Sequence, residues 1–198
     1  KDRPYYTDGN FDFKTKLVET TYSSASYILE SPQVRLTLIY AIDEKGVLTI
    51  DYDASFDYSF AGEPIRVGLY GIVLCEGEKM EFVGRGPWEN YCDRNSSAQF
   101  GKYSGKIEDF AFEYIKPQEN GNHTGVSYLQ LGKDLEFSAV GSPFEAGVNN
   151  ASFEGLSGKN HTPEVVRLPS GQAALYIHAA QAGVGGTDTW SLRAAPRT

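Results

Sequence analysis

Two alternating apolar runs joined by a short polar turn constrain the fold of this chain more than any other feature. In the first run, Gln33–Ile42, every second residue is apolar, which would place those side chains on one face of a strand. The same alternation recurs over Leu48–Phe56. The intervening residues Asp43–Gly46 are polar and end in glycine, as turns often do. This pattern predicts an antiparallel β-hairpin.

Further strands are expected along most of the remaining chain. The segments with strand composition are Ile65–Leu74, Lys79–Val83, Ala111–Tyr114, Val126–Leu131, Leu135–Val140 and Ala173–Ala180. Helical periodicity is nearly absent, and Asn150–Leu156 suits one short helix. Because no strand–helix alternation occurs, the expected class is all-β, a large antiparallel β-sandwich. No change in composition marks a boundary, so we expect one domain over residues 1–198.

Charge and composition exclude several function classes. The net charge is −8 and the pI is near 4.9, so the chain would repel a phosphate backbone, and nucleic acid is not an expected partner. No apolar run reaches the ~18 residues of a membrane helix, and no membrane partner is expected. No signal-peptide pattern opens the sequence, and the compartment, cytoplasmic or periplasmic, stays open.

Metal and nucleophile motifs are missing from the sequence. His123, His161 and His178 lie far apart, and no metal-ligand spacing connects them, so no metal site or cofactor is expected in this chain. The sequence contains no GxSxG elbow for nucleophilic catalysis. Cys75 suits a buried free thiol, while its pairing with Cys92 stays open. The 26 acidic residues form pairs by chance, and no pair is selected as catalytic.

A glycine-rich loop near the end of the sequence carries one of the two tryptophans. The segment Gln181–Trp190 reads QAGVGGTDTW, and its glycines allow the backbone to bend freely. It lacks the spacing of a phosphate-binding loop. Trp190 either anchors the loop to the core or stacks its indole on a ligand, because an exposed indole is unfavourable without a partner.

The densest group of polar and aromatic residues lies between two expected strands, in Gly84–Tyr103. Opposite charges this close together can form a hydrogen-bonded network that orders a loop, with Arg94 paired to Glu89 or Asp93. The alternative is a polar surface that addresses sugar hydroxyls or another domain. The residues concerned are Arg85, Trp88, Glu89, Asn90, Tyr91, Asp93 and Arg94.

Three motifs together resemble the C-terminal domain of β-galactosidases of glycoside hydrolase family 2, also called the small-chain or fifth domain. They are GRGPWENYCDR (84–94), PQENGN (117–122) and GVGGTDTW (183–190), in the order and at the approximate spacing of that family. The resemblance covers about Glu19 to Trp190. It adds two residues to the structural or interface motif, Glu119 and Asn120.

The resemblance implies a β-supersandwich similar to galactose mutarotase, joined to a catalytic α/β-barrel that this chain lacks. The chain alone is then expected to be inactive and to hold no catalytic residue. Any divalent metal that the parent enzyme needs would belong to its catalytic domain. By motif position, Trp190 and Asp188 would bind the galactoside, on a loop shaped by Gly183, Gly185 and Gly186. The first part of the family domain and its last strand are expected to lie outside this chain.

Several positions depart from the family pattern. Cys92 stands where proline is common, His123 where arginine is usual, and Thr187 where aspartate is frequent. Gly125 and Ser127 lie in a stretch that usually reads Asp-x-Arg. The loss of Arg and Asp partners could loosen that loop or change the sugar preference, so a β-glycoside other than lactose is a further candidate substrate.

The sequence therefore favours a non-catalytic carbohydrate-binding domain of a β-galactosidase that completes the galactoside pocket. Its expected partners are the galactoside, the parent's catalytic domain and further copies in a homo-oligomer. One alternative is an aldose mutarotase or epimerase, which needs a histidine acid and a carboxylate base at the sugar ring. Another is a free-standing carbohydrate-binding module.

Overall fold

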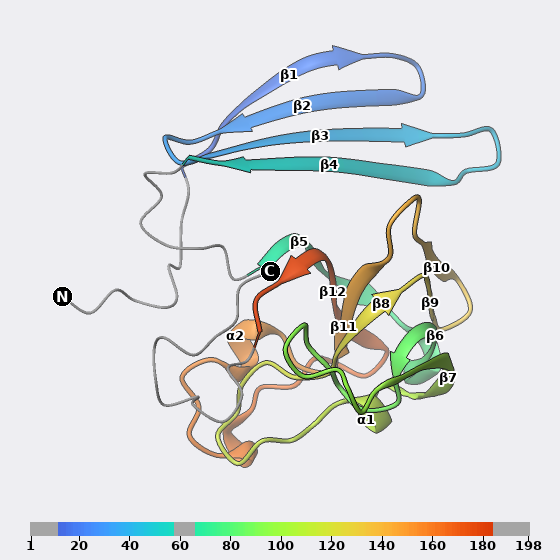
Figure 1. Cartoon of the computed structure of the whole chain (residues 1–198), viewed down its shortest axis with the longest axis vertical. Helices are drawn as coiled ribbons and strands as arrows, with labels where there is room; N and C mark the ends of the chain where they lie inside the picture. The colour runs from blue at the N-terminus through green and yellow to red at the C-terminus, as the bar shows by residue number, and fades with distance from the viewer. Residues whose placement is uncertain (1–11, 58–65, 184–198) are drawn as a thin grey trace. The chain divides into compact units, whose positions relative to one another are not determined.

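The computed structural model describes residues 12–57 and 66–183, in which nearly all regular structure is β-strand (Figure 1). The chain divides into two compact units, Lys1–Glu63 and Pro64–Thr198, and each is described by itself. The expectation of a single domain over 1–198 therefore stays a prediction. No helix among the described residues is long and apolar enough to cross a membrane.

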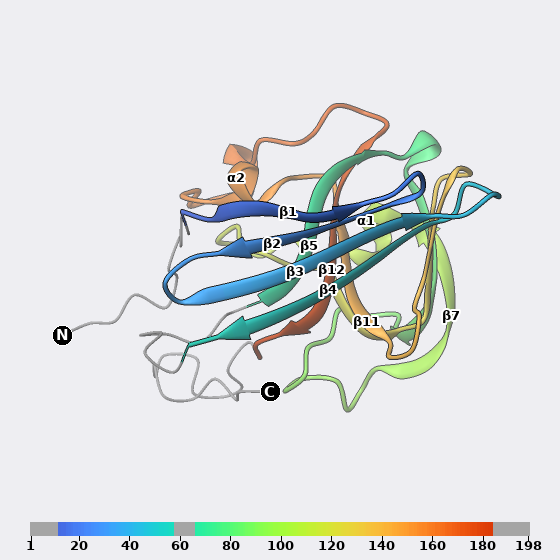
Figure 2. The ribbon, with the colours of Figure 1, turned by 90° about the horizontal axis from the view of Figure 1, so that it is seen from above.

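The N-terminal unit contains a four-stranded antiparallel sheet in sequence order (Figure 2). Its strands are β1 (Lys14–Thr20), β2 (Ser24–Glu30), β3 (Val34–Ile42) and β4 (Leu48–Phe56). The predicted hairpin is β3–β4, and the two alternating runs face each other in register from Val34 opposite Phe56 to Ile42 opposite Leu48. This confirms the hairpin.

The hairpin turn closes through its first residue, Asp43. One carboxylate oxygen of Asp43 accepts hydrogen bonds from the backbone N–H groups of Lys45 (2.8 Å) and Val47 (2.9 Å). Gly46 has φ of 81°, a left-handed conformation that glycine adopts without steric cost. The turn chemistry read from the sequence therefore operates in the fold.

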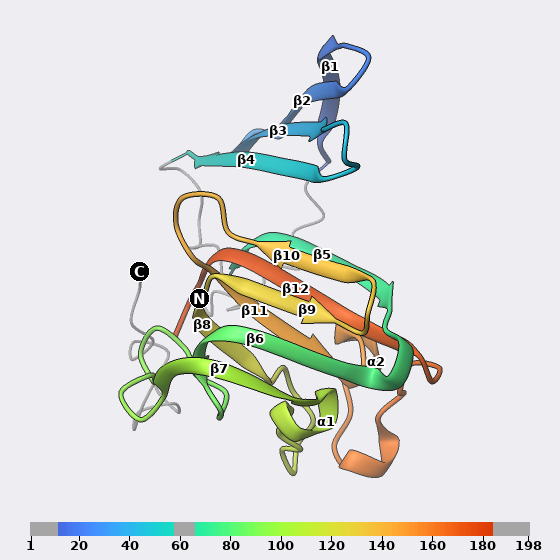
Figure 3. The same cartoon turned by 90° about the vertical axis from the view of Figure 1, so that its right-hand side faces the viewer.

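The C-terminal unit is a sandwich of two four-stranded antiparallel sheets (Figure 3). One sheet has the order β10-β9-β6-β7, and the other has the order β5-β12-β11-β8. The first comprises β6 (Lys79–Gly86), β7 (Gln99–Lys106), β9 (Tyr128–Leu131) and β10 (Leu135–Ser138). The second comprises β5 (Arg66–Leu74), β8 (Asn122–Val126), β11 (Phe144–Asn149) and β12 (Gln172–Gln181). The predicted all-β antiparallel sandwich is confirmed.

The core of this sandwich lies between the two sheets. Phe82 and Leu129 come from one sheet, Val126 and Val148 from the other, and each is at least 99% buried. Burial of apolar side chains from both faces supplies the main driving force that holds the layers together. The 3-10 turns η1 (Glu76–Glu78) and η2 (Thr162–Glu164) and the short helices α1 (Ile107–Phe110) and α2 (Phe153–Leu156) lie in the connections.

Two sequence predictions in this unit need correction. The expected strand Ala111–Tyr114 is irregular, because its backbone pairs locally: the Phe112 N–H donates to Asn120 Oδ1 and the Tyr114 N–H to the Phe112 carbonyl. The expected strand Val126–Leu131 spans parts of two strands, since β8 pairs with β11 whereas β9 pairs with β6 and β10. The chain changes sheets at Ser127.

Candidate functional site

The loop that connects β6 to β7 is organised around Asn90, whose side chain is 99% buried. This side chain makes four hydrogen bonds, donating to the carbonyls of Arg85 and Trp88 and accepting from the N–H and hydroxyl of Thr124. The Asn90 backbone also pairs with Asn122 in both directions. Because every polar atom of the Asn90 amide has a partner, the loop is fixed onto β8.

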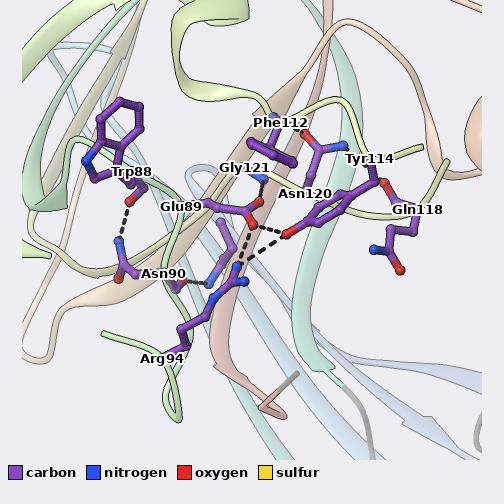
Figure 4. A network of polar contacts seen from close by, with 10 residues as sticks. Trp88, Glu89, Asn90, Arg94, Phe112, Tyr114, Gln118, Asn120 and Gly121 are labelled. Carbon is purple, nitrogen blue, oxygen red and sulfur yellow. Dashed lines mark hydrogen bonds and ion pairs between the residues drawn. The ribbon is translucent and has the colours of Figure 1, made fainter. Parts of the chain in front are cut away.

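Glu89 joins this loop to the segment that contains the PQENGN motif (Figure 4). One of its carboxylate oxygens accepts from Arg94 and from the Tyr114 hydroxyl, and the other accepts from the Gly121 N–H at 2.8 Å. The Glu89 side chain is only 9% exposed, so these charge-assisted bonds are shielded from water. The predicted Arg94 pairing is confirmed with Glu89 as the partner.

Asn120 orders the second motif. Its side-chain oxygen accepts from the Phe112 N–H (3.0 Å) and from the Asn149 amide (2.8 Å), and its nitrogen donates to the Gln118 carbonyl. The next residue, Gly121, has φ of 78°, which a residue with a side chain rarely adopts. Asn120 thus ties the irregular segment to the end of β11.

Glu119 bridges the first residue of β5 and the last residue of β12. One carboxylate oxygen of Glu119 pairs with the Arg66 guanidinium, and the other accepts from the Gln181 amide at 3.0 Å. Arg66 and Gln181 lie directly opposite each other in the β5–β12 register. Burial raises the pKa of Glu119, and the Arg66 charge opposes that rise.

A second carboxylate, Glu145, lies on the other side of Gln181. It accepts from the Asn122 amide at 2.8 Å and from the Gln181 backbone. Burial is the main cause that raises the pKa of Glu145. The last residue of β12 is therefore held by two acidic side chains that come from different segments.

The first glycine of the GVGG loop packs directly against the first motif. A Cβ atom placed on Gly183 would lie 2.4 Å from Cγ of Asp93, closer than any side chain tolerates. The GRGPWENYCDR and PQENGN motifs and the first residue of GVGGTDTW thus meet at the exit of β12. Gly185, Gly186, Asp188 and Trp190 lie outside the described residues, and their roles stay predictions.

The other predicted motif residues have structural positions. Arg85 donates to the Ala98 carbonyl at 3.2 Å, and Tyr91 is buried with the Arg94 guanidinium 5.3 Å from its ring centre. Burial strongly raises the pKa of Tyr91, so its hydroxyl stays protonated. Trp88, by contrast, is 70% exposed.

His123 is one of two histidines buried in the C-terminal unit. Its ring lies 4.3 Å from the ring centre of Phe82 and packs edge-on against Phe110, while Nδ1 contacts the Arg85 carbonyl. Burial lowers the pKa of His123 to about 4 and that of His178 to about 4. The position at which the resemblance expects arginine is therefore occupied by a neutral aromatic core residue.

No group of three or more His, Cys, Asp or Glu side chains suited to a metal ion occurs within 12–57 and 66–183. Cys75 and Cys92 are both free thiols. A pocket of about 340 Å³ lies beside the network, between segments 111–120 and 149–167. Its polar walls include side chains that bond one another, such as Arg167 with Asn150 and Glu113.

Sequence reasoning missed three residues of the site, namely Arg66, Glu145 and Gln181. Each lies inside or at the end of a strand, where its sequence neighbours suggest only an alternating pattern. The pairing of Arg66 with Gln181 depends on strand order, which local sequence does not reveal. The terminal position of Gln181 beside the GVGG loop was the one available signal.

The fold and the site define an all-β sandwich domain whose polar loops converge at one strand end. Comparison with known proteins gives its family: the model of the family described as Beta galactosidase small chain matches residues 5–197. The chain therefore belongs to the β-galactosidase small-chain family.

Several curated relatives are β-galactosidases. The chain is 32% identical over 178 residues to that of Oenococcus oeni, covering 90% of this chain and 17% of the relative. It is 30% identical over 192 residues to that of Streptococcus thermophilus (93% and 18%) and 33% identical over 171 residues to that of Yersinia enterocolitica (85% and 16%). The chain thus spans about a sixth of the length of these relatives.

Proposed function

We propose that this chain is the non-catalytic sugar-pocket domain of a β-galactosidase and that the rest of the enzyme supplies the catalytic groups. Its role is to present the loop after β12 to the galactoside, with Trp190 stacking on the apolar face of the sugar and Asp188 orienting hydroxyl groups. The chain alone would be inactive. Its partners would be the enzyme's catalytic domain and, through the oligomer, further copies.

The convergence of the three motifs at one strand end is the observation that supports this proposal most. A loop that only connects two elements needs few fixed contacts. Here Glu119, Glu145 and Asp93, from three separate segments, all approach Gln181–Gly183. Such an investment in one loop base is typical of a functional loop carried on a rigid scaffold.

The test is Trp190→Ala in the complete β-galactosidase. We expect KM for a galactoside to rise by about tenfold, equivalent to about 1.4 kcal/mol, because the stacking surface is lost. Trp88→Ala is the matched control, since Trp88 is exposed on the β6–β7 loop, and its KM should stay unchanged. Equal kinetic constants for Trp190→Ala and the parent enzyme would overturn the substrate role.

Calorimetry with the 198-residue chain alone separates this proposal from a free-standing carbohydrate-binding module. A partial pocket predicts absent or millimolar galactose binding, since most of the sugar's contacts would be missing. Micromolar binding would favour the module instead.

The mutarotase alternative has less support from the described residues. That reaction needs a histidine that donates a proton near neutral pH. His123 and His178 are buried with pKa values lowered to about 4, which favours the neutral ring. Polarimetry of freshly dissolved galactose decides the question, and accelerated interconversion of the anomers would restore this alternative.

A further inference from the structure

The exit of β12 is held from both sides of its last ladder pair. Glu119 contacts Arg66 and Gln181 at the same time, and these two residues are opposite each other in the β5–β12 register. Glu119 comes from the irregular segment before β8. It therefore closes the strand pair from outside the sheet, where no further strand residue continues the ladder.

The contacts at this exit are shielded from water. Gln181 is only 4% exposed, and its amide nitrogen is directed to Glu119 while its backbone contacts Glu145. Arg66 also lies over the Tyr176 ring, 5.8 Å from its centre, which fixes the guanidinium along β12. Charge-assisted bonds in such surroundings have more directional strength than exposed pairs.

A third contact fixes the chain two residues further on. Because Asp93 occupies the space beside the Gly183 α-carbon, the backbone at residue 183 can lie in only a narrow range of positions. Asp93 itself belongs to the loop that Asn90 attaches to β8. The exit is thus bounded by two loops that are each anchored independently.

We propose that Glu119 and Asp93 are positioning residues for galactoside binding: they fix Gln181–Gly183 and so set the direction in which the Trp190 loop leaves the fold. This inference rests on the proposed function. Neither residue needs to touch the sugar. Their effect reaches the substrate through the placement of Trp190.

A spectroscopic experiment tests the positioning without any activity. The chain has two tryptophans, so Trp88→Phe leaves Trp190 as the only indole. In this background we expect Glu119→Ala and Asp93→Ala to change the acrylamide quenching constant of Trp190 by about twofold or more, because one or two lost contacts shift a local equilibrium severalfold. Circular dichroism and the melting temperature establish that each variant is folded.

Two further variants keep the result specific. Glu113→Ala removes an exposed pair with Arg167 in the same irregular segment and should leave the quenching constant unchanged. Glu119→Gln keeps an acceptor for Gln181 and should restore part of the parent value. Unchanged quenching in folded Glu119→Ala and Asp93→Ala would overturn the inference.

Kinetics in the complete β-galactosidase distinguishes this inference from the proposed function. If both hold, Trp190→Ala and Glu119→Ala each raise KM, and the double variant adds little, since both act through one loop. If Trp190→Ala raises KM and Glu119→Ala does not, the function stands and the positioning role fails. If neither raises KM, the proposed function fails, while the quenching result still decides whether Glu119 positions the loop.

Discussion

Gly183 and Asp93 approach so closely that a Cβ atom on Gly183 would lie 2.4 Å from Asp93 Cγ. The contact joins the start of the third sequence motif to the first. It also explains why glycine is required at this position by space rather than by backbone angle, because no left-handed φ is found there.

Gly183→Ala should destabilise the protein by about 1–3 kcal/mol, the usual cost of forcing an extra methyl group into a packed site. Chemical denaturation measures the loss. Gly71→Ala is the control, since a Cβ there meets nothing within 4 Å, and it should change stability by less than about 0.5 kcal/mol. Asp93→Ala should relieve part of the Gly183→Ala cost, and strict additivity of the two changes would contradict the contact.

Asn90→Ala should cost about 2–4 kcal/mol, because it leaves several buried partners without hydrogen bonds, including the Thr124 N–H. Urea unfolding gives the value. Asn95 lies in the same loop, and its amide makes one long contact, 3.4 Å to the Cys92 carbonyl, so Asn95→Ala should be nearly neutral. Similar losses for the two variants would refute the role of Asn90 as the anchor of the loop.

The Glu89–Arg94 pair should show a larger coupling energy than the Glu113–Arg167 pair. Glu89 is nearly buried and Glu113 is mostly exposed, so water screens the second pair more. Double-mutant cycles should give about 1–2 kcal/mol for Glu89–Arg94 after allowance for the exposed Arg94, and about 0–0.5 kcal/mol for the other. Equal couplings, or equal sensitivity to salt, would contradict this ranking.

His178→Met should leave stability near pH 7 unchanged or increase it. Both ring nitrogens of His178 are buried without a hydrogen-bond partner, so an apolar side chain of similar length loses no bond. Chemical denaturation at neutral pH measures the effect. A loss above about 2 kcal/mol would indicate a contact that the neutral ring makes and methionine does not.

The same variant should also change the pH dependence of stability. The folded pKa of His178 is lowered from 6.5 to about 4, so the unfolded chain takes up the proton first as the pH falls. Stability is then complete above about pH 6.5 and decreases by about 3 kcal/mol down to about pH 4, below which this contribution is constant. Glu119 and Glu145, whose pKa values are raised, act in the opposite direction, so the difference between His178→Met and the parent protein isolates the histidine.

Local pattern was sufficient for much of the fold. The alternation over Gln33–Phe56 and the turn at Asp43–Gly46 specified a hairpin and its register, because side-chain period and turn chemistry are local properties. Local pattern failed at Ala111–Tyr114, where the backbone found partners in its own loop. It also missed β7 and β11, whose glycines and polar residues weaken the strand signal.

For the site, the sequence by itself determined which residues form the motifs, that Arg94 would pair with an acidic neighbour, and which family the motifs resemble. Only the tertiary structure decided that Glu119 pairs with Arg66, 53 positions earlier, and that Asp93 approaches Gly183, 90 positions later. The physical reason is that hydrogen bonds and close packing depend on distance in space, and the order of strands in a sheet sets that distance between residues far apart along the chain.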